Sequence, residues 1–164
     1  MTGGYTLHRK EIEQAVLTSL TTNLLGTIGW VVYKRGGLRQ LPADLVNQCP
    51  ILLVKGVGVK DMEPGPGSYQ LHPHYLIDVW LIERRTDGDE TDETINDHAD
   101  EVMSVLAWEF QSNLDPAPPG LELARLIHCD ADTDNPLGEH IDTVTLRIVS
   151  AKIRLTFEAI ESSQ

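Results

Sequence analysis

Two stretches of the chain repeat apolar residues with the 3.6-residue period of an α-helix. The first, LHRKEIEQAVLTSLTTNLL at residues 7–25, has Thr6 as a candidate N-cap and Gly26 as a natural stop. The second begins after an acidic run and reaches Phe110. The apolar stripes consist of Ile12, Ala15, Val16, Ser19, Leu20, Asn23 and Leu24, and of Ile95, Ala99, Val102, Met103, Leu106, Ala107 and Phe110. The spacing predicts two amphipathic helices.

Other stretches are rich in β-branched and aromatic residues or alternate with a period of two, which predicts strands. In the last of them the apolar positions change phase by one residue near Ile148 and Val149. That slip predicts a β-bulge or bend, where the strand changes partners or leaves the sheet. The predicted strands cover residues 28–34, 51–60, 74–85, 121–130 and 142–159.

The segments between these strands carry turn and breaker residues. Residues 42–50 are bracketed by prolines, which predicts a turn or one short helix. Glycines 56 and 58 predict a bulge or close backbone contact in the second strand, and the loop 61–73 is not expected to continue that strand.

The predicted order of elements is α-β-β-β-α-β-β, with apolar residues on both faces of the strand 74–85. Such a strand belongs in the middle of a sheet. The simplest arrangement is α+β: a mostly antiparallel sheet with two main helices packed on one face. No repeat and no linker divides the sequence, so we expect one domain over residues 1–164.

The stretch RRTDGDETDETINDHAD at residues 84–100 raises a choice between a metal site, acid–base chemistry and the start of a helix. Carboxylates are favoured at a helix N-terminus, where unpaired N–H groups and the helix dipole attract negative charge. Most of this run is therefore interpreted as helix-starting chemistry. Arg84 and Arg85 precede this run. They either balance the charge of the nearby Asp87 and Asp89 or anchor the protein to an acidic neighbouring subunit, and we favour the local charge match.

Charge limits the classes of partner. The formal net charge is −12, concentrated in this run and in a second one at residues 128–142. A protein that binds nucleic acid tightly needs a basic face, so tight DNA binding is not expected, whereas an acidic channel wall along which DNA slides is compatible with this charge.

The two cysteines, Cys49 and Cys129, have no disulfide or metal spacing and are expected to be reduced thiols. Neither a signal pattern nor a membrane-spanning run is present, so synthesis in the cytoplasm is expected.

The sequence carries no complete catalytic or metal-binding motif. Asp130, Asp132 and Asp134 resemble the start of a calcium loop, but Asn135 and Ile141 stand where Gly and Glu are required. The preferred interpretation is an acidic hairpin between two strands. The fragment GVG at 56–58 is no phosphate loop, no serine lies in a nucleophile elbow, and neither cysteine has a catalytic context. His72, His74, His98, His128 and His140 lack the spacing of a zinc site. We therefore name no catalytic, cofactor-binding or metal-binding residue, and expect no cofactor and no enzymatic activity.

The order of elements, read with particular stretches, resembles phage tail-terminator and tail-completion proteins, including Mu-like minor tail proteins. The resemblance spans roughly residues 7 to 158 and rests on four features. These are the helix HRKEIEQAVLTSLTTNLL, the strand CPILLVKGV, the strand YLIDVWLIERR leading through a polar turn into the helix ETINDHADEVMSVLAWEF, and a closing strand pair.

The resemblance implies a structural virion protein that forms a ring, commonly of six subunits, at the head-proximal end of a tail tube. Its implied partners are copies of itself, the tail tube protein and a neck or head–tail connector protein, with DNA passing through the channel. The loop 61–73 and the hairpin 130–141 are the candidates for reaching neighbours or facing the channel. Two alternatives stay open: another ring of the phage neck, and a small-molecule or metal-binding α+β module, with or without enzymatic activity, that uses the hairpin 130–142.

Overall fold

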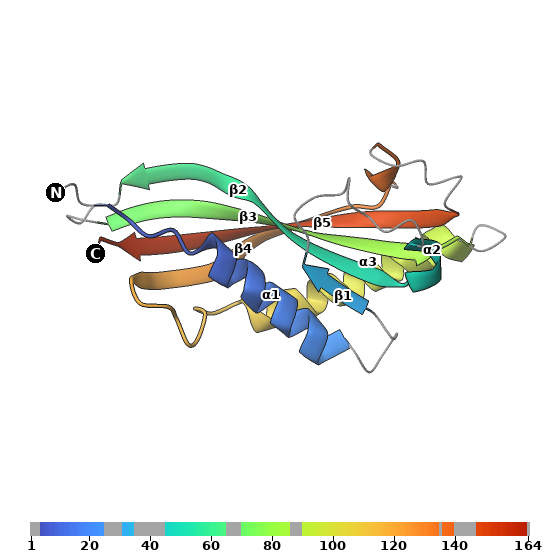
Figure 1. Cartoon of the computed structure of the whole chain (residues 1–164), viewed down its shortest axis with the longest axis horizontal. Helices are drawn as coiled ribbons and strands as arrows, with labels where there is room; N and C mark the ends of the chain where they lie inside the picture. Colours follow the sequence, from blue (N-terminus) through green and yellow to red (C-terminus); the bar gives the residue numbers. More distant parts are fainter. Residues whose placement is uncertain are drawn as a thin grey trace.

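The computed structural model describes residues 4–24, 31–34, 45–64, 70–85, 90–134, 136–139 and 147–163. The fold is α+β, as the sequence predicts, and its elements follow the expected order (Figure 1). In chain order they are α1 (Arg9–Leu24), β1 (Val31–Lys34), α2 (Leu45–Gln48), β2 (Ile51–Pro64), β3 (Gln70–Arg84), α3 (Glu90–Glu109), β4 (Leu121–Asp132), the 3-10 helix η2 (Pro136–Glu139) and β5 (Ile148–Ser162).

The strands form one five-stranded sheet in the order β1-β2-β3-β5-β4. β1 pairs with β2 in parallel, and every other pair of neighbours is antiparallel. β3 lies in the middle and is buried from Ile77 to Glu83, which confirms the prediction from its two apolar faces. The short helix α2 confirms the expectation for residues 42–50.

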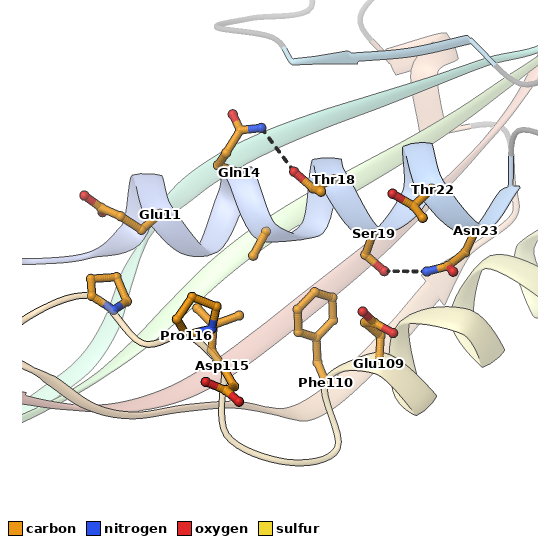
Figure 2. Close-up of a pocket in the computed structure, with 13 residues that line it drawn as sticks. Glu11, Gln14, Thr18, Ser19, Thr22, Asn23, Glu109, Phe110, Asp115 and Pro116 are labelled. Carbon is orange, nitrogen blue, oxygen red and sulfur yellow. Dashed lines mark hydrogen bonds between the residues drawn. The ribbon is translucent and has the colours of Figure 1, made fainter.

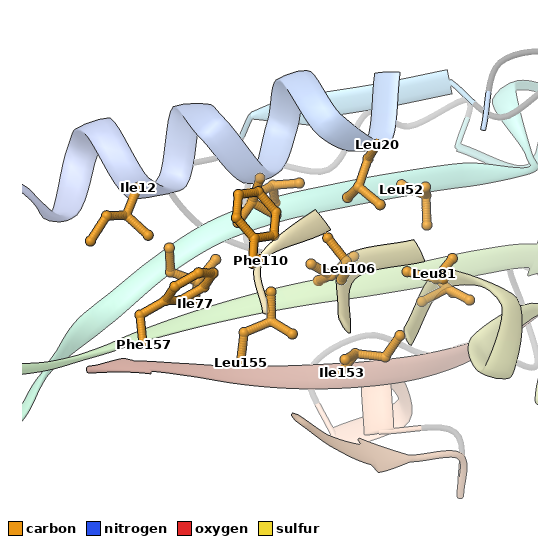
Figure 3. Packing of buried hydrophobic residues seen from close by; sticks show 14 of the residues in the cluster. Ile12, Leu20, Leu52, Ile77, Leu81, Leu106, Phe110, Ile153, Leu155 and Phe157 are labelled. Carbon is orange, nitrogen blue, oxygen red and sulfur yellow. The ribbon is translucent and has the colours of Figure 1, made fainter. Parts of the chain in front are cut away.

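Both long helices pack on the same face of the sheet and enclose the main core with it (Figure 3). Buried side chains at helical spacing on α1 and α3 meet alternate residues of the strands, as the apolar stripes predict. Ala107 and Asn23, which also lie on the predicted stripes, are exposed. Phe110 and Phe157 make an edge-to-face contact with ring centroids 5.5 Å apart. The labelled core consists of Ile12, Leu20, Leu52, Ile77, Leu81, Leu106, Phe110, Ile153, Leu155 and Phe157.

The other face of the sheet is covered at one end by η2. Leu137 of η2 lies in a second apolar cluster with Trp80 and Ile148, and its backbone N–H donates to Oγ of Ser150 at 3.0 Å. Both faces of β5 are therefore buried at its start, which explains why apolar residues there occupy both phases. The expected bulge at Ile148 and Val149 is wrong, because the register of β5 with β3 is constant from Arg84↔Ile148 to Gln70↔Ser162. The alternative of a bend agrees with the structure, since β5 begins at Ile148 directly after Arg147, which has a φ of 53°; residues 142–146 of the predicted strand lie outside the described residues.

Two boundaries differ from the sequence prediction. β2 continues to Pro64 and β3 begins at Gln70, so most of the predicted loop 61–73 is a hairpin arm; residues 65–69 lie outside the described residues. The arm tolerates Asp61 at a φ of 51° because the register shifts between Lys60 and Glu63. At the first helix Thr6 is not the cap: α1 begins at Arg9, and the N–H of Ile12 bonds to the carbonyl of His8.

Candidate interaction surface

One end of the sheet extends past the start of α1, and both chain ends lie there (Figure 1). We call it the projecting end and define it as residues 4–8, 55–64 and 70–75. At Gly56, β2 passes close to the side chains of Arg9 and Glu13 on α1. The N–H of Gly56 donates to Oε2 of Glu13 at 2.8 Å, and a Cβ at this position would collide with the same oxygen. The predicted bulge is present, as a register shift between Gly56 and Gly58.

A buried polar network fastens the projecting end. Nδ1 of His8 lies 2.6 Å from Oε2 of Glu161, and the hydroxyl of Tyr75 donates to Oε1 of Glu161 at 2.5 Å. All three side chains are buried, at 4%, 0% and 0% exposure for His8, Glu161 and Tyr75. Burial, followed by the bond to Glu161, raises the pKa of Tyr75, so the phenol stays protonated. The network joins the N-terminal segment to two central strands.

The projecting end also exposes apolar side chains. Five of the seven large hydrophobic residues that are exposed within the described part of the chain lie on it. Val59 pairs directly with Tyr75, whose hydroxyl accepts from the backbone N–H of His8, so the N-terminal segment and β2 meet here. A concentration of exposed apolar residues marks an association surface more often than scattered single residues do. The five are Tyr5 at 39%, Leu7 at 42%, Val57 at 40%, Val59 at 38% and Met62 at 52% exposure.

The other two exposed hydrophobic residues are Trp108, at 75% exposure on α3, and Ile127, at 44% on β4. Phe110 brings these elements together, because its carbonyl accepts from the N–H of Leu126 at 2.9 Å. Seven of the twenty residues of α3 are acidic, and none is Lys or Arg. Residues 97, 101, 104 and 108 share one face by helical spacing, so the acidic residues Asp97 and Glu101 lie in line with Trp108. We call Asp97, Glu101, Ser104 and Trp108 the α3 stripe.

The prediction that the acidic run starts a helix agrees with α3, which begins at Glu90. Further along α3, Nδ1 of His98 lies within hydrogen-bonding distance of Oε1 of Glu83 on β3. Burial raises the pKa of Glu83, and the charge and hydrogen bond of His98 oppose that rise. This pair ties α3 to the sheet.

A groove of about 570 Å³ runs between α1 and the segment that follows α3 (Figure 2). Its α1 wall is polar, with Gln14 bonded to Thr18 and Asn23 bonded to Ser19. The lining includes three carboxylates and no Lys, Arg or His, so the groove favours cationic over anionic groups. The residues are Glu11, Gln14, Ala15, Thr18, Ser19, Thr22, Asn23, Glu109, Phe110, Leu114, Asp115, Pro116 and Pro118.

The acidic hairpin does not form a calcium loop within the described residues. Asp130 and Asp132 belong to β4, where they pair across the strands with Arg154 and Lys152 of β5. Asp134 follows in a turn, with its N–H bonded to Oδ1 of Asp132 at 3.2 Å. Nowhere in the described part of the chain do three His, Cys, Asp or Glu side chains come together as metal ligands. Asn135 and residues 140–142 lie outside the described residues.

Neither thiol is activated. Burial raises the pKa of both Cys49 and Cys129 to about 11, and neither cysteine forms a disulfide. His128 is exposed on β4, and His140 lies outside the described residues.

Arg84 and Arg85 are exposed at the end of β3. The backbone N–H of Arg85 donates to the carbonyl of Arg147 at 2.8 Å. Their expected partners Asp87 and Asp89 lie outside the described residues, so the local match stays a prediction. None of the described helices is long and apolar enough to cross a membrane.

Sequence reasoning named no site residue. It named the loop 61–73 as a candidate for reaching neighbours, which overlaps the projecting end, but it did not foresee the exposed apolar side chains of residues 4–8 and 55–60. The signal was weak: Val57 and Val59 alternate with Gly58 and Lys60, which is the pattern of a half-buried strand, and Met62 is out of phase with them. Only the length of β2 beyond α1 reveals that this half carries exposed apolar side chains.

Neither a protein-family model nor a curated protein matches the chain. Among solved structures, a chain from "Virion of native gene transfer agent (GTA) particle" is similar to this one. The similarity covers 92% of this chain and 94% of that chain, with a TM-score of 0.49 and 15% sequence identity. A likeness of this size leaves the function to be argued from the residues of this chain.

Proposed function

We propose that the protein is a structural virion protein that forms a ring at the head-proximal end of a phage tail tube. There it ends tube growth and joins the tail to the neck or head. Its partners are further copies of itself, the tail tube protein and a neck or connector protein. DNA passes through the channel as cargo, and the protein carries out no reaction.

The observation that carries this proposal is the projecting end, where five exposed apolar side chains gather on a strand arm and the N-terminal segment. Exposing them costs free energy unless another protein covers them. The network around Glu161 fastens the N-terminal segment to β3 and β5, and the β2 arm is paired with β3, so both are presented in a defined orientation rather than as a loose tail. Rigid presentation suits a subunit that assembles, because less conformational entropy is lost on association.

The charge supports a passage for DNA. A net charge of −12 repels phosphate, and within the described side chains of α3 the acidic residues Asp97, Asp100, Glu101 and Glu109 have no Lys or Arg of the same helix beside them. We propose that these acidic residues, rather than the arm at 61–73, face the channel or a basic neighbour.

The alternative of a metal-binding module using residues 130–142 has less support, because Asp130 and Asp132 each lie opposite a cation on β5. A different ring of the phage neck fits the same surfaces as a terminator and remains the runner-up within the structural class.

Native mass spectrometry of the full chain, with calcium and then with chelator, tests the proposal. The subunit mass is 18.2 kDa, so a ring of about six subunits has a mass on the order of 110 kDa. A closed ring that is indifferent to chelation is expected. A monomer that takes up calcium overturns the proposal in favour of the binding module, and a metal-free monomer overturns the ring.

To separate a terminator from another neck ring, the purified ring is added to polymerising tail tube protein and tube lengths are measured by electron microscopy. A terminator shortens the tubes and is found at one tip. Tubes of unchanged length with bare tips contradict the terminator role and leave the neck ring.

A further inference from the structure

We infer that the projecting end of one copy docks on the α3 stripe of the next, so that the ring is built from a single head-to-tail contact. This inference rests on the proposed ring and names the two surfaces that form it. The occupant of the α3 stripe is therefore a second copy of this chain.

The first argument is charge. The projecting end itself carries two basic and two acidic residues, and Arg9 and Lys10 at the start of α1 give this end an excess of basic residues. Lys10 and Lys60 are exposed, with the Lys60 side chain 62% accessible. The ion pair of Lys60 with Asp61 spans 3.7 Å on the surface and contributes little. Residues 4–10 and 55–64 contain four basic residues, Arg9, Lys10, Lys55 and Lys60, and two acidic ones, Asp61 and Glu63.

The second argument is that the acceptor has the opposite sign and its own apolar centre. Asp97 and Glu101 lie in line with Trp108, which is the most exposed large hydrophobic residue of the described chain. Tryptophan surrounded by charge is typical of the energetic centre of an interface, because its large side chain gains most when water is removed. Val59 and Met62 supply apolar partners, and Lys10 and Lys60 supply the countercharge.

The third argument is placement. β2 and β4 are separated in the sheet by β3 and β5, and α3 ends beside β4 while the projecting arm belongs to β2. Two different complementary surfaces on one subunit form a heterologous contact. Such a contact repeats from copy to copy and gives a ring where the rotation closes, or an open fibre where it does not.

The test uses two charge-reversed variants of the full chain. Lys10→Glu/Lys60→Glu makes the projecting end acidic, and Asp97→Lys/Glu101→Lys makes the α3 stripe basic. In either variant alone, the projecting end of one copy would meet an α3 stripe of the same charge on the next copy. Its association is therefore expected to weaken by about tenfold or more at low salt. Mixed in equal amounts they should reassemble with the two variants alternating, because each acidic end then meets a basic stripe and each basic end an acidic one.

Native mass spectrometry and sedimentation velocity measure the assemblies. The single variants Glu101→Lys and Asp134→Lys form a matched pair, because each reverses one acidic charge. Asp134 is exposed and belongs to neither surface, so Asp134→Lys should associate like the wild type, whereas Glu101→Lys should associate more weakly. Trp108→Ala should weaken association by about tenfold without lowering the melting temperature. Circular dichroism of each variant checks that it is folded.

The outcomes separate this inference from the proposed function. A ring that tolerates both reversals overturns the inference and leaves the ring. Charge-dependent, mutually rescued association into open fibres supports the contact and overturns the closed ring. A wild-type monomer overturns both.

Discussion

The two outer edges of the sheet are treated differently. The edge of β4 is covered over its first half by the segment that follows α3. The N–H of Leu114 donates to the carbonyl of Ala124 at 2.8 Å, and the Asn113 side chain bonds both Ala124 N–H and Glu122 carbonyl. β2 is paired with β3 along its inner edge, but its outer edge has a partner strand, β1, only from Ile51 to Val54. Among the described residues, that outer edge is bonded beyond Val54 only at Gly56.

Uncovered edges present unpaired N–H and C=O groups, and proteins usually blunt them with charges, bulges or cover. β4 has cover, whereas the arm of β2 relies on two register shifts and on Lys55, Lys60, Asp61 and Glu63. Cover adds stability to the subunit itself. Bulges and charges only prevent unwanted pairing, so they leave side chains available for a specific partner. The difference predicts that changes at the β4 edge act on stability and changes on the β2 arm act on assembly.

The strongest test at the covered edge is Phe110→Ala. Phe110 is 4% exposed, packs on Phe157 and starts the segment that covers β4. Removing the ring should lower the free energy of unfolding by about 3–5 kcal/mol, measured by urea denaturation. Trp108→Ala, two residues away and exposed, is the matched control and should change it by less than about 0.5 kcal/mol. Equal losses in the two variants would mean that the segment is not anchored through Phe110.

At the projecting end, Glu161→Leu tests what fastens the arm. The hydroxyl of Tyr75 and the backbone N–H of His8 would both lose a buried acceptor. The expected loss is about 3 kcal/mol in the free energy of unfolding. Hydrogen exchange at residues 5–8 should quicken in the same variant. Unchanged exchange there would show that the network does not hold the N-terminal segment. Glu158→Leu, on the half-exposed face of β5, is the control and should cost less.

A smaller effect is expected for Asn113→Ala, which removes two bonds from the β4 edge. The loss should be about 1–2 kcal/mol, because Ala124 N–H loses its acceptor. Asn96→Ala, at an exposed position on α3, supplies the comparison. Asn113→Ala could instead promote self-association while the free energy of unfolding stays constant. In that case the segment bonded to β4 prevents strand pairing with other molecules and does not stabilise the subunit.

The Glu83–His98 pair gives a pH dependence. The folded state raises the pKa of Glu83 above its ordinary value of 4.5, so it holds the proton more tightly than the unfolded chain does. The resulting stability is complete below the unfolded pKa and is lost as pH rises through the folded pKa. Urea denaturation at a series of pH values between about 4 and 7 measures this effect. As pH rises, the free energy of unfolding of the wild type should fall relative to that of Glu83→Gln. Parallel pH profiles would contradict this assignment, and Glu109→Gln, exposed at the end of α3, serves as the control.

Much of this fold could be predicted from local pattern. Both helices and all five strands lie where apolar periodicity placed them, since a one-sided antiparallel sheet imposes a regular period on each element. The errors arose where tertiary contacts decide. At the start of β5, apolar residues occupy both faces of the strand because η2 covers Ile148 on the second face. β2 continues past Asp61 because β3 supplies a pairing partner as far as Leu71.

The candidate surfaces were harder to foresee. Glu161, Tyr75 and His8 are distant in sequence and of ordinary type, so nothing in their spacing reveals that they form one buried network. Trp108 falls just beside the apolar stripe of α3, and an aromatic residue there is expected to be in the core. Asp130 and Asp132 gave the clearest sequence signal, yet the structure places them on β4 in register with Arg154 and Lys152, and Arg154 forms its ion pair with Asp78.

The smallest effect on stability, and the sharpest test of the comparison, is expected for Met62→Lys on the open arm. Met62 is 52% exposed, so its substitution should change the free energy of unfolding by less than about 0.5 kcal/mol. Assembly should nevertheless weaken, because an apolar contact is lost from the surface proposed to meet the next copy. Urea denaturation and native mass spectrometry of the same sample measure the two quantities. Ile127→Lys, at the uncovered part of the β4 edge, is the matched control at 44% exposure. If Met62→Lys lowered the free energy of unfolding and left assembly unchanged, the β2 arm would act on stability and not on assembly, contrary to the assignment made above.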